Sequence, residues 1–232
     1  HGDYVYLVLR YIKPDINKIY RSLNCKNMIY IIKNIMNLHN EGLTHRDIKP
    51  DNFLVNNNDD KKIKLIDFGL ATDDSTKFIL NGTPDYLSID HIIYPRLHFN
   101  KIYINHDYWS LAHFFLKTIN SNRTFRIYQY GINKGHLYQL FQQNDFDIYC
   151  YENRMRINKE QKKNNLIDIL LKDSKDKNNR NLIGLAKDIV EDIISLLNFN
   201  ISKRKKISDI LGKLENLQNQ IERQTNKYFT NV

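Results

Sequence analysis

The residues whose types and spacing could support chemistry lie in three short runs of this 232-residue chain. The runs are residues 45–52 (HRDIKPDN), 67–69 (DFG) and 82–84 (GTP). The first run places the carboxylate of Asp47 two residues before the cation of Lys49, and it ends on the amide of Asn52. Oxygens of Asn52 and Asp67 are hard ligands of the kind that magnesium takes in proteins. An isolated Asp in a loop is more often a turn or cap residue, so the interpretation depends on the three runs together.

In this order the three runs resemble the catalytic loop, the metal-binding motif and the substrate-positioning segment of eukaryotic-type Ser/Thr protein kinases. DFG alone is a weak signal, but an eight-residue loop followed after a hairpin by DFG is a specific one. Lys49 marks the Ser/Thr kinases, because tyrosine kinases usually carry other residues there. The resemblance implies an enzyme that transfers the γ-phosphate of ATP to Ser and Thr hydroxyls of protein substrates, with Mg2+ as the metal.

The resemblance also implies a role for each polar residue of these runs. In phosphoryl transfer the protein contributes mainly by positioning the reactants and neutralising charge. Asp47 is then the base that accepts and orients the substrate hydroxyl proton, and Lys49 stabilises charge on the transferring phosphate. Asn52 and Asp67 are the magnesium ligands, which the intervening hairpin brings to one site. Thr83 belongs to the segment that positions the peptide, and it completes the predicted catalytic set.

Other positions match structural residues of the family. His45 is expected to stack under the ring of Phe68. Asp107 opens a DYWSL run that resembles the start of the central buried helix, where the Asp braces the catalytic-loop backbone. Arg204 and Asp90 match a buried ion pair at the end of the activation segment, although Asp is one methylene shorter than the usual Glu. Breaking such a pair from one side costs about 3–5 kcal/mol.

The resemblance extends to a nucleotide pocket. Residues 6–12 (YLVLRYI) are similar to the last small-lobe strand running into the hinge, where the backbones of Arg10 and Ile12 would meet the adenine edge. Leu54 would form the floor beneath adenine, and Ile66 the wall before the metal-binding motif. Core packing explains apolar residues such as these about equally well.

Apolar periodicity predicts the elements that position these runs. Strands are expected at 53–55 and 63–66, joined by a polar hairpin loop, and helices at 27–39, 107–119, 165–171, 183–197 and 207–217. Glu41 and Gly42 supply a stop for the first helix. We predict an α+β, protein-kinase-like fold, mainly the helical C-lobe with the last N-lobe strand and hinge, and with the N-lobe largely absent. The expected divisions are the strand and hinge at 1–12, the C-lobe at 13–215 and a polar C-terminal tail at 216–232.

The Gly-rich loop and the strand Lys that kinases place before the hinge are not found in this sequence. We expect a fragment of an active kinase, because the active-site residues of the large lobe are all present. On this view the 232 residues alone bind ATP weakly and transfer little phosphate. The alternative is a non-catalytic pseudokinase or scaffold. A small-molecule phosphotransferase of related fold is disfavoured, because the 45–52 and 82–84 runs serve a peptide substrate.

Two features depart from the usual kinase pattern. Ile79 occupies the position of the activating phosphosite, three residues before the GTP run, so we predict that activity does not depend on phosphorylation there. Ser75 and Thr76 remain possible substitutes. Residues 86–91 and 52–54 resemble casein kinase 1, but the tryptophan of the DYWSL run does not fit that subgroup.

Composition limits the class of protein and its cellular compartment more than it indicates a reaction. Hydrophobic residues at 41% and aromatic residues at 12% allow a buried core and exclude a wholly disordered chain. A net charge of +9 could suit an acidic partner, but a compositionally biased genome gives the same lysine surplus, so no nucleic-acid partner is predicted. Cys25 and Cys150 match no disulfide framework, and no apolar run is long enough for a membrane span. We therefore expect an intracellular, cytoplasmic protein with no membrane partner, of undetermined oligomeric state.

Overall fold

The computed structural model describes residues 19, 21–55, 63–73, 82–83, 86, 88, 102–117, 159–198 and 201–229. Its helices are α2 (Cys25–Asn40), α4 (Ile102–Lys117), α7 (Lys159–Leu170), α8 (Arg180–Ser195) and α9 (Ile207–Phe229). Two short 3-10 helices, η1 (Pro50–Asn52) and η5 (Ile201–Lys203), and two strands, β1 (Phe53–Val55) and β2 (Ile63–Leu65), complete these elements. The described part of the chain is thus mostly helical with a small two-stranded sheet, which agrees with the predicted protein-kinase-like α+β fold.

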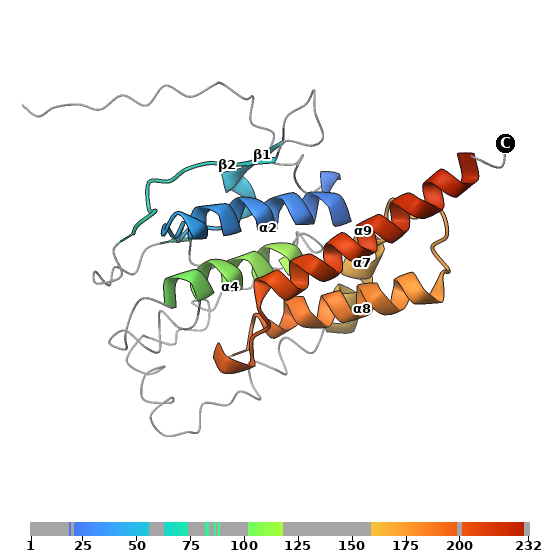
Figure 1. The fold of residues 1–232 in the computed structure, drawn as a ribbon. Coiled ribbons are helices and arrows are strands. Elements are labelled where there is room, and N and C mark those ends of the chain that lie inside the picture. Colours follow the sequence, from blue (N-terminus) through green and yellow to red (C-terminus); the bar gives the residue numbers. More distant parts are fainter. Residues whose placement is uncertain are drawn as a thin grey trace, which may run out of the picture.

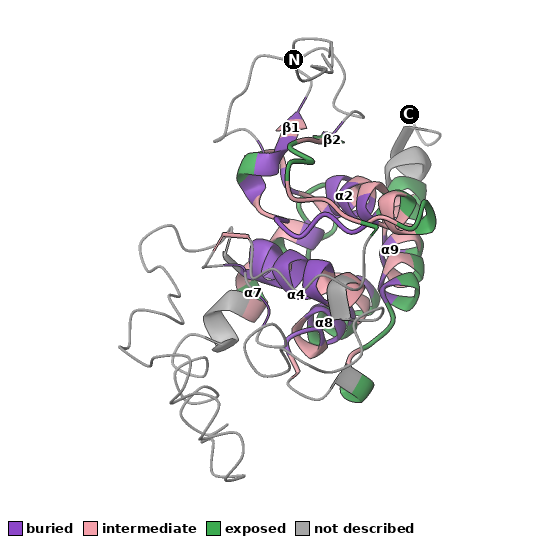
Figure 2. Cartoon of the chain, turned by 90° about the vertical axis from the view of Figure 1, so that its left-hand side faces the viewer, coloured by how far each residue is buried: buried purple, intermediate pink, exposed green. Residues whose placement is uncertain are grey.

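The helices pack around α4, which lies at the centre (Figure 1). Helix α9 packs against both α2 and α8, and α7 packs against α8 and α4. Figure 2 shows that α4 is buried along most of its described length, whereas the outer face of α9 is exposed. An all-round buried helix is typical of the centre of a large helical unit. His106 and Asp107, near the start of α4, are buried in this way.

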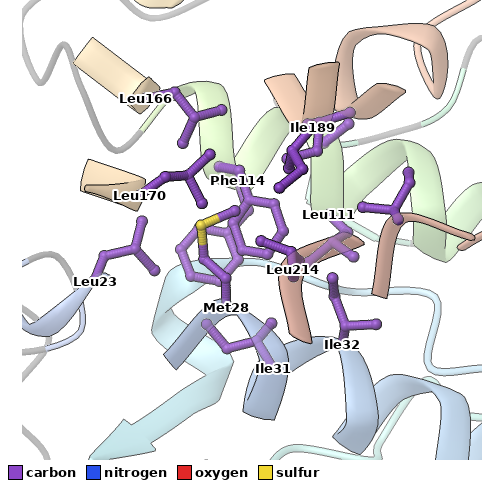
Figure 3. Close-up of a cluster of buried hydrophobic side chains, with 14 of the residues drawn as sticks. Leu23, Met28, Ile31, Ile32, Leu111, Phe114, Leu166, Leu170, Ile189 and Leu214 are labelled. Carbon is purple, nitrogen blue, oxygen red and sulfur yellow. The ribbon is translucent and has the colours of Figure 1, made fainter. Parts of the chain in front are cut away.

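One apolar cluster joins these helices (Figure 3). It brings together Met28 of α2, Phe114 of α4, Leu170 of α7, Ile189 of α8 and Leu214 of α9, all at most 1% exposed. Close packing of this kind makes the volume of each side chain matter. The cluster fixes the helices that carry the polar site residues at their ends.

Helix α2 is explained by local sequence signals, and the chain runs from its end into the 45–52 loop. The side chain of its N-cap residue, Asn24, accepts a hydrogen bond from the Asn27 N–H at 2.8 Å. The helix ends at the predicted stop, where Gly42 has a φ of 77°, in the left-handed region that favours glycine. The predicted helix over 27–39 is confirmed, with two more residues at its start.

The predicted hairpin is also confirmed, and it connects two of the polar runs. Strands β1 and β2 are antiparallel, with Phe53 opposite Leu65. The ring of Phe53 packs on that of Phe114 in α4 at 5.5 Å between centroids. Just beyond the ladder the Ile66 N–H donates to the carbonyl of Asn52 at 2.9 Å, so the pairing continues by one bond toward the site.

The remaining helices differ from prediction mainly in their bounds. Helix α4 begins at residue 102, not 107, and α7 at residue 159, not 165. The largest correction concerns the C-terminus, where we expected a polar tail from residue 216 but α9 runs on to Phe229. Leu217 and Ile221 continue the apolar stripe and are buried, so the predicted boundary at 215 falls inside a packed helix. None of the helices within the described ranges is long and apolar enough to cross a membrane.

Candidate active site

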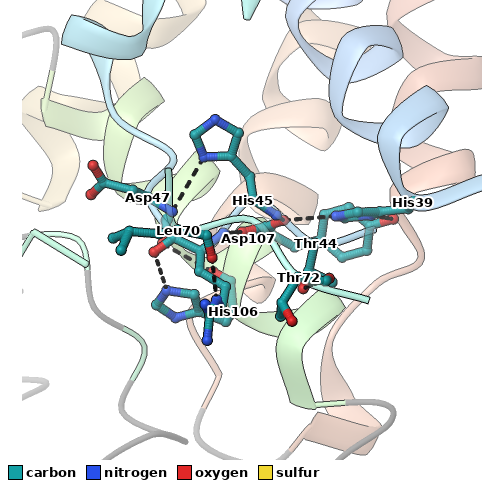
Figure 4. A network of polar contacts seen from close by, with 11 residues as sticks. His39, Thr44, His45, Asp47, Leu70, Thr72, His106 and Asp107 are labelled. Carbon is teal, nitrogen blue, oxygen red and sulfur yellow. Dashed lines mark hydrogen bonds and ion pairs between the residues drawn. The ribbon is translucent and has the colours of Figure 1, made fainter. Parts of the chain in front are cut away.

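The backbone of the 45–52 loop is held by one buried carboxylate, that of Asp107 in α4 (Figure 4). Its Oδ2 accepts the His45 N–H and its Oδ1 accepts the Arg46 N–H, each at 2.8 Å. Arg46 has a φ of 65°, a conformation that is unfavourable for a residue with a side chain and persists only where its surroundings fix it. The predicted bracing of the loop by Asp107 is confirmed.

A buried histidine that the sequence did not single out supports this carboxylate. His39, at the end of α2, donates from Nε2 to Asp107 Oδ2 at 2.8 Å and contacts the Tyr108 hydroxyl through Nδ1 at 3.1 Å. Burial alone would raise the pKa of Asp107, but the hydrogen bond and charge of His39, with the hydrogen bond from the His45 N–H, hold that pKa below its ordinary value. Asp107 is therefore an ionised acceptor at neutral pH. Burial, with the Asp107 charge, raises the pKa of Tyr108 to about 12.

Asp47 lies next in the loop with hydrogen bonds to both carboxylate oxygens. Oδ1 accepts the N–H of Thr83 at 2.9 Å and its hydroxyl at 2.7 Å. Oδ2 pairs with Lys49 Nζ at 2.7 Å and accepts from Asn52 Nδ2 at 3.1 Å. Burial raises the pKa of Asp47, but the hydrogen bonds from Lys49 and Thr83 and the Lys49 charge outweigh it, and the net pKa is below the ordinary value.

Lys49 and Thr83 complete a three-way contact with this carboxylate. Lys49 Nζ donates to Thr83 Oγ1 at 2.8 Å in addition to pairing with Asp47. The contact joins the 45–52 run to the 82–84 run, which lie far apart in sequence. A cation and a hydroxyl thus converge on a single fixed carboxylate. Such an arrangement can orient a hydroxyl and neutralise an anionic group beside it.

The two predicted magnesium ligands reach the site by the hairpin but differ in burial. Asn52 is buried and donates from Nδ2 to the Asp47 carbonyl at 2.7 Å, which leaves its side-chain oxygen outside that contact. Asp67 follows Ile66, whose N–H bonds to the Asn52 carbonyl, so the two ligand residues lie near each other. Asp67 is exposed, has a φ of 62°, and accepts from the Gly69 N–H at 3.4 Å. Amide and carboxylate oxygens of this kind suit Mg2+.

His45 is structural in this site, as predicted. Its ring, which is buried, lies 5.3 Å from that of Phe68 at an interplanar angle of 60°. Nε2 donates to the carbonyl of Ile66 at 3.0 Å, which leaves Nδ1 to accept the N–H of Asp47 at 3.3 Å. His45 thereby ties the DFG segment to the catalytic loop. The Phe68 ring is itself 50% exposed.

Several predicted positions lie outside the described residues. They are Arg10 and Ile12 with the strand at 6–12, the Ile79 position with Ser75 and Thr76, and Asp90. Leu54 and Ile66, predicted to contact adenine, are half-buried next to the site. Arg204 Nε donates to the carbonyl of Asn198 at 2.8 Å, and its guanidinium lies 5.1 Å from the centre of the Trp109 ring.

Comparison with known proteins relates this chain to protein kinases. Residues 1–213 match the protein kinase domain family. The chain is 34% identical over 110 residues to ovarian-specific serine/threonine-protein kinase Lok of Drosophila melanogaster, covering 39% of this chain and 22% of that protein. It is 30% identical over 147 residues to serine/threonine-protein kinase MPS1 of Encephalitozoon cuniculi, and the match covers 57% of this chain and 24% of that protein. The chain thus spans about a quarter of the length of these curated relatives.

Proposed function

This chain belongs to the eukaryotic-type Ser/Thr protein kinase family, and we propose that its site transfers the γ-phosphate of ATP to serine and threonine hydroxyls of protein substrates. The observation that carries the proposal is the contact of Asp47 with Lys49 and Thr83. A structural loop has no need of a carboxylate, a cation and a hydroxyl from two distant runs at one point. A phosphoryl-transfer site needs this combination to position its reactants.

Asp47 is the residue that we propose to act on the protein substrate. A serine or threonine oxygen attacks the γ-phosphorus of ATP, the bond to the β–γ bridging oxygen breaks, and ADP leaves. The hydroxyl proton passes to the Asp47 carboxylate. The lowered pKa keeps Asp47 ionised and able to accept a hydrogen bond from the incoming hydroxyl at neutral pH. Lys49, which shares the site with Asp47, neutralises charge on the transferring phosphoryl group.

Asn52 and Asp67 would hold Mg2+ in this site. Their donor set fits the ion, since Mg2+ is bound by one or two protein oxygens together with water and substrate phosphates. When bound, the ion neutralises charge on the phosphate oxygens. Asn52 is fixed by its bonds to Asp47, whereas the exposed Asp67 carboxylate is open to a ligand. For the nucleotide itself we propose Leu54 and Ile66 beside adenine, with the backbones of Arg10 and Ile12 at its edge.

The test uses the full-length product of the gene that encodes this chain, because the chain spans only part of its kinase relatives. The protein is incubated with γ-labelled ATP, Mg2+ and a peptide library in which serine, threonine and tyrosine are equally represented. We expect phosphoserine and phosphothreonine, loss of transfer when Mg2+ is chelated, and loss in an Asp67→Asn variant. Absence of transfer to any peptide would contradict the proposal and favour a non-catalytic scaffold. Predominant phosphotyrosine would overturn the assignment of substrate class.

A further inference from the structure

A second buried histidine, His106 of α4, bridges two parts of the site. His106 Nδ1 accepts the N–H of Ser88 at 3.1 Å, and its Nε2 contacts the carbonyl of Arg46 at 3.3 Å. Figure 4 shows the His106 ring reaching the loop backbone beside Asp107. His106 is 1% exposed and Ser88 is fully buried. One imidazole therefore joins the end of the substrate-positioning segment to the catalytic loop.

The two contacts together define the chemical form of this imidazole. An N–H donor faces Nδ1, so Nδ1 must offer its lone pair. A carbonyl oxygen faces Nε2, so Nε2 must carry the proton. Only the neutral ring with its proton on Nε2 satisfies both neighbours at once. His106 therefore accepts a hydrogen bond from Ser88 at one end and donates one to Arg46 at the other. A side chain that can only donate, or can only accept, cannot make both bonds.

The segment that His106 holds also contacts Asp47. One turn farther along α4, the Ser110 hydroxyl donates to the carbonyl of Tyr86 at 2.6 Å. The Tyr86 N–H in turn donates to the carbonyl of Thr83 at 2.9 Å, and Thr83 makes its two bonds to Asp47. His106 and Ser110 are thus two anchors on one helix face. They set where the segment enters the active site.

We propose that His106 is a positioning residue that fixes the peptide-binding segment against the catalytic loop. The proposal rests on the proposed kinase function. The Ser88 contact sets the position of the segment that receives the peptide, and so governs the KM for peptide. The Arg46 contact sets the position of the loop that carries Asp47, and so governs kcat. His106 acts through these two neighbours and touches no reactant.

Two substitutions separate the contacts, because amide side chains of different length place their polar atoms differently. In His106→Asn the amide oxygen lies near the position of Nδ1 and still accepts from Ser88, but this shorter side chain no longer contacts the Arg46 carbonyl. In His106→Gln the amide nitrogen reaches the position of Nε2 and donates to Arg46, while the hydrogen bond from the Ser88 N–H to the His106 position is lost. Losing one buried hydrogen-bond partner corresponds to a change of about tenfold.

The experiment measures peptide phosphorylation kinetics and amide hydrogen exchange on the full-length protein. We expect His106→Asn to lower kcat about tenfold with little change in peptide KM, and His106→Gln to raise peptide KM about tenfold with little change in kcat. Exchange at the Ser88 amide should speed up in His106→Gln and stay slow in His106→Asn. Asp192→Asn, which removes the ion pair with Lys213, is a control for lost stability. It should change neither kcat nor the KM for peptide.

The exchange measurement keeps this inference separate from the proposed function. If the wild type transfers no phosphate, the kinase proposal fails, and a difference in Ser88 exchange between the two variants still supports the bridge. Equal exchange at Ser88 in the Asn and Gln variants would overturn the bridge whether or not the protein is active. An active protein in which both variants change kcat and KM alike would show a general packing role and would overturn the positioning role.

Discussion

The polar layer around Asp107 and the apolar cluster between α2, α4, α7, α8 and α9 are both buried, but they are held in different ways. In the polar layer, defined as residues 44–52 with His39, His106 and Asp107, most contacts are single hydrogen bonds with fixed donors and acceptors. In the apolar cluster the contacts are many, weak and without direction. Substitutions of unchanged shape should therefore be costly in the first region and tolerated in the second.

The difference follows from what each region must do. Directional bonds fix the loop backbone even where Arg46 takes an unfavourable φ, and they leave the side chain of Asp47 at a defined place. The apolar cluster supplies the free energy that holds the surrounding helices together. Stability and positioning are thus separated in space, and each can be tested by its own kind of substitution.

The largest effect on stability is expected in the apolar cluster when volume is removed. Leu214 in α9 is fully buried, so Leu214→Ala should lower the free energy of unfolding by about 2–5 kcal/mol. Leu214→Met keeps nearly the same volume and should cost less than about 1.5 kcal/mol. Urea denaturation of the two variants measures the contrast. A Met variant as damaging as the Ala variant would show that volume does not govern this region.

A change without loss of volume should be costly in the polar layer. In Asp107→Asn, one carboxylate oxygen becomes an amide NH2 that faces N–H donors from the loop or from His39. We expect a loss of about 1–3 kcal/mol of unfolding free energy, because a buried donor is left without an acceptor. The same urea titration measures it. A loss within about 0.5 kcal/mol, the range of an ordinary surface substitution, would contradict the directional account.

Stability should also depend on acid pH through this layer. The pKa values of Asp107 and Asp47 are both lowered in the folded state, whereas the pKa of an Asp in the unfolded chain is about 3.9. Their contribution is therefore complete above about pH 4–5 and is lost as the pH falls through the folded pKa. Urea midpoints should rise from about pH 3 to pH 5 and then level off. Asp107→Asn should rise less steeply, and an identical profile would contradict the assignment.

The smallest effect is expected at a thiol of the apolar region. Cys25 is buried, donates weakly to the carbonyl of Leu214 at 3.4 Å, and has a pKa raised to about 12 by burial and by the charge of Asp173. Because the thiolate is the reactive form, a thiol reagent at pH 8 should modify Cys25 only as fast as the protein unfolds. The measurement uses a Cys150→Ser variant, in which labelling of this 232-residue chain reports on Cys25. Fast labelling of the native protein would show that this contact opens locally.

Local patterns in the sequence predicted much of the fold. The hairpin, α2 and its stop at Gly42 follow from residues close together in the chain. The last part of α9 was not predicted. Leu217 and Ile221 are surrounded by polar residues in the sequence, so their helical spacing was not recognised as an apolar stripe. That stripe is evident only when its partner helices, far away in sequence, are in place.

The candidate site divides in a similar way. The 45–52 run and its family resemblance predicted Asp47, Lys49, Asn52 and the bracing role of Asp107. They did not predict His39 or His106, because Asp107 lies 68 residues from His39 and Arg46 lies 60 residues from His106. A single histidine on a helix has no periodic or motif signal. The left-handed φ of Arg46 was equally hidden, because an Arg–Asp pair in a loop gives no reason to expect it.

The most direct test of the central claim compares two aspartates of the same loop in the full-length protein. Asp47 is buried in the proposed site, and Asp51, four residues on, is exposed. Single-turnover transfer from Mg-ATP to a serine peptide should slow by about 10²–10⁴-fold in Asp47→Asn, the usual contribution of a positioned base. Asp51→Asn, with the same change of charge, should leave the rate unchanged. Equal rates in the two variants, with both proteins folded, would contradict the account.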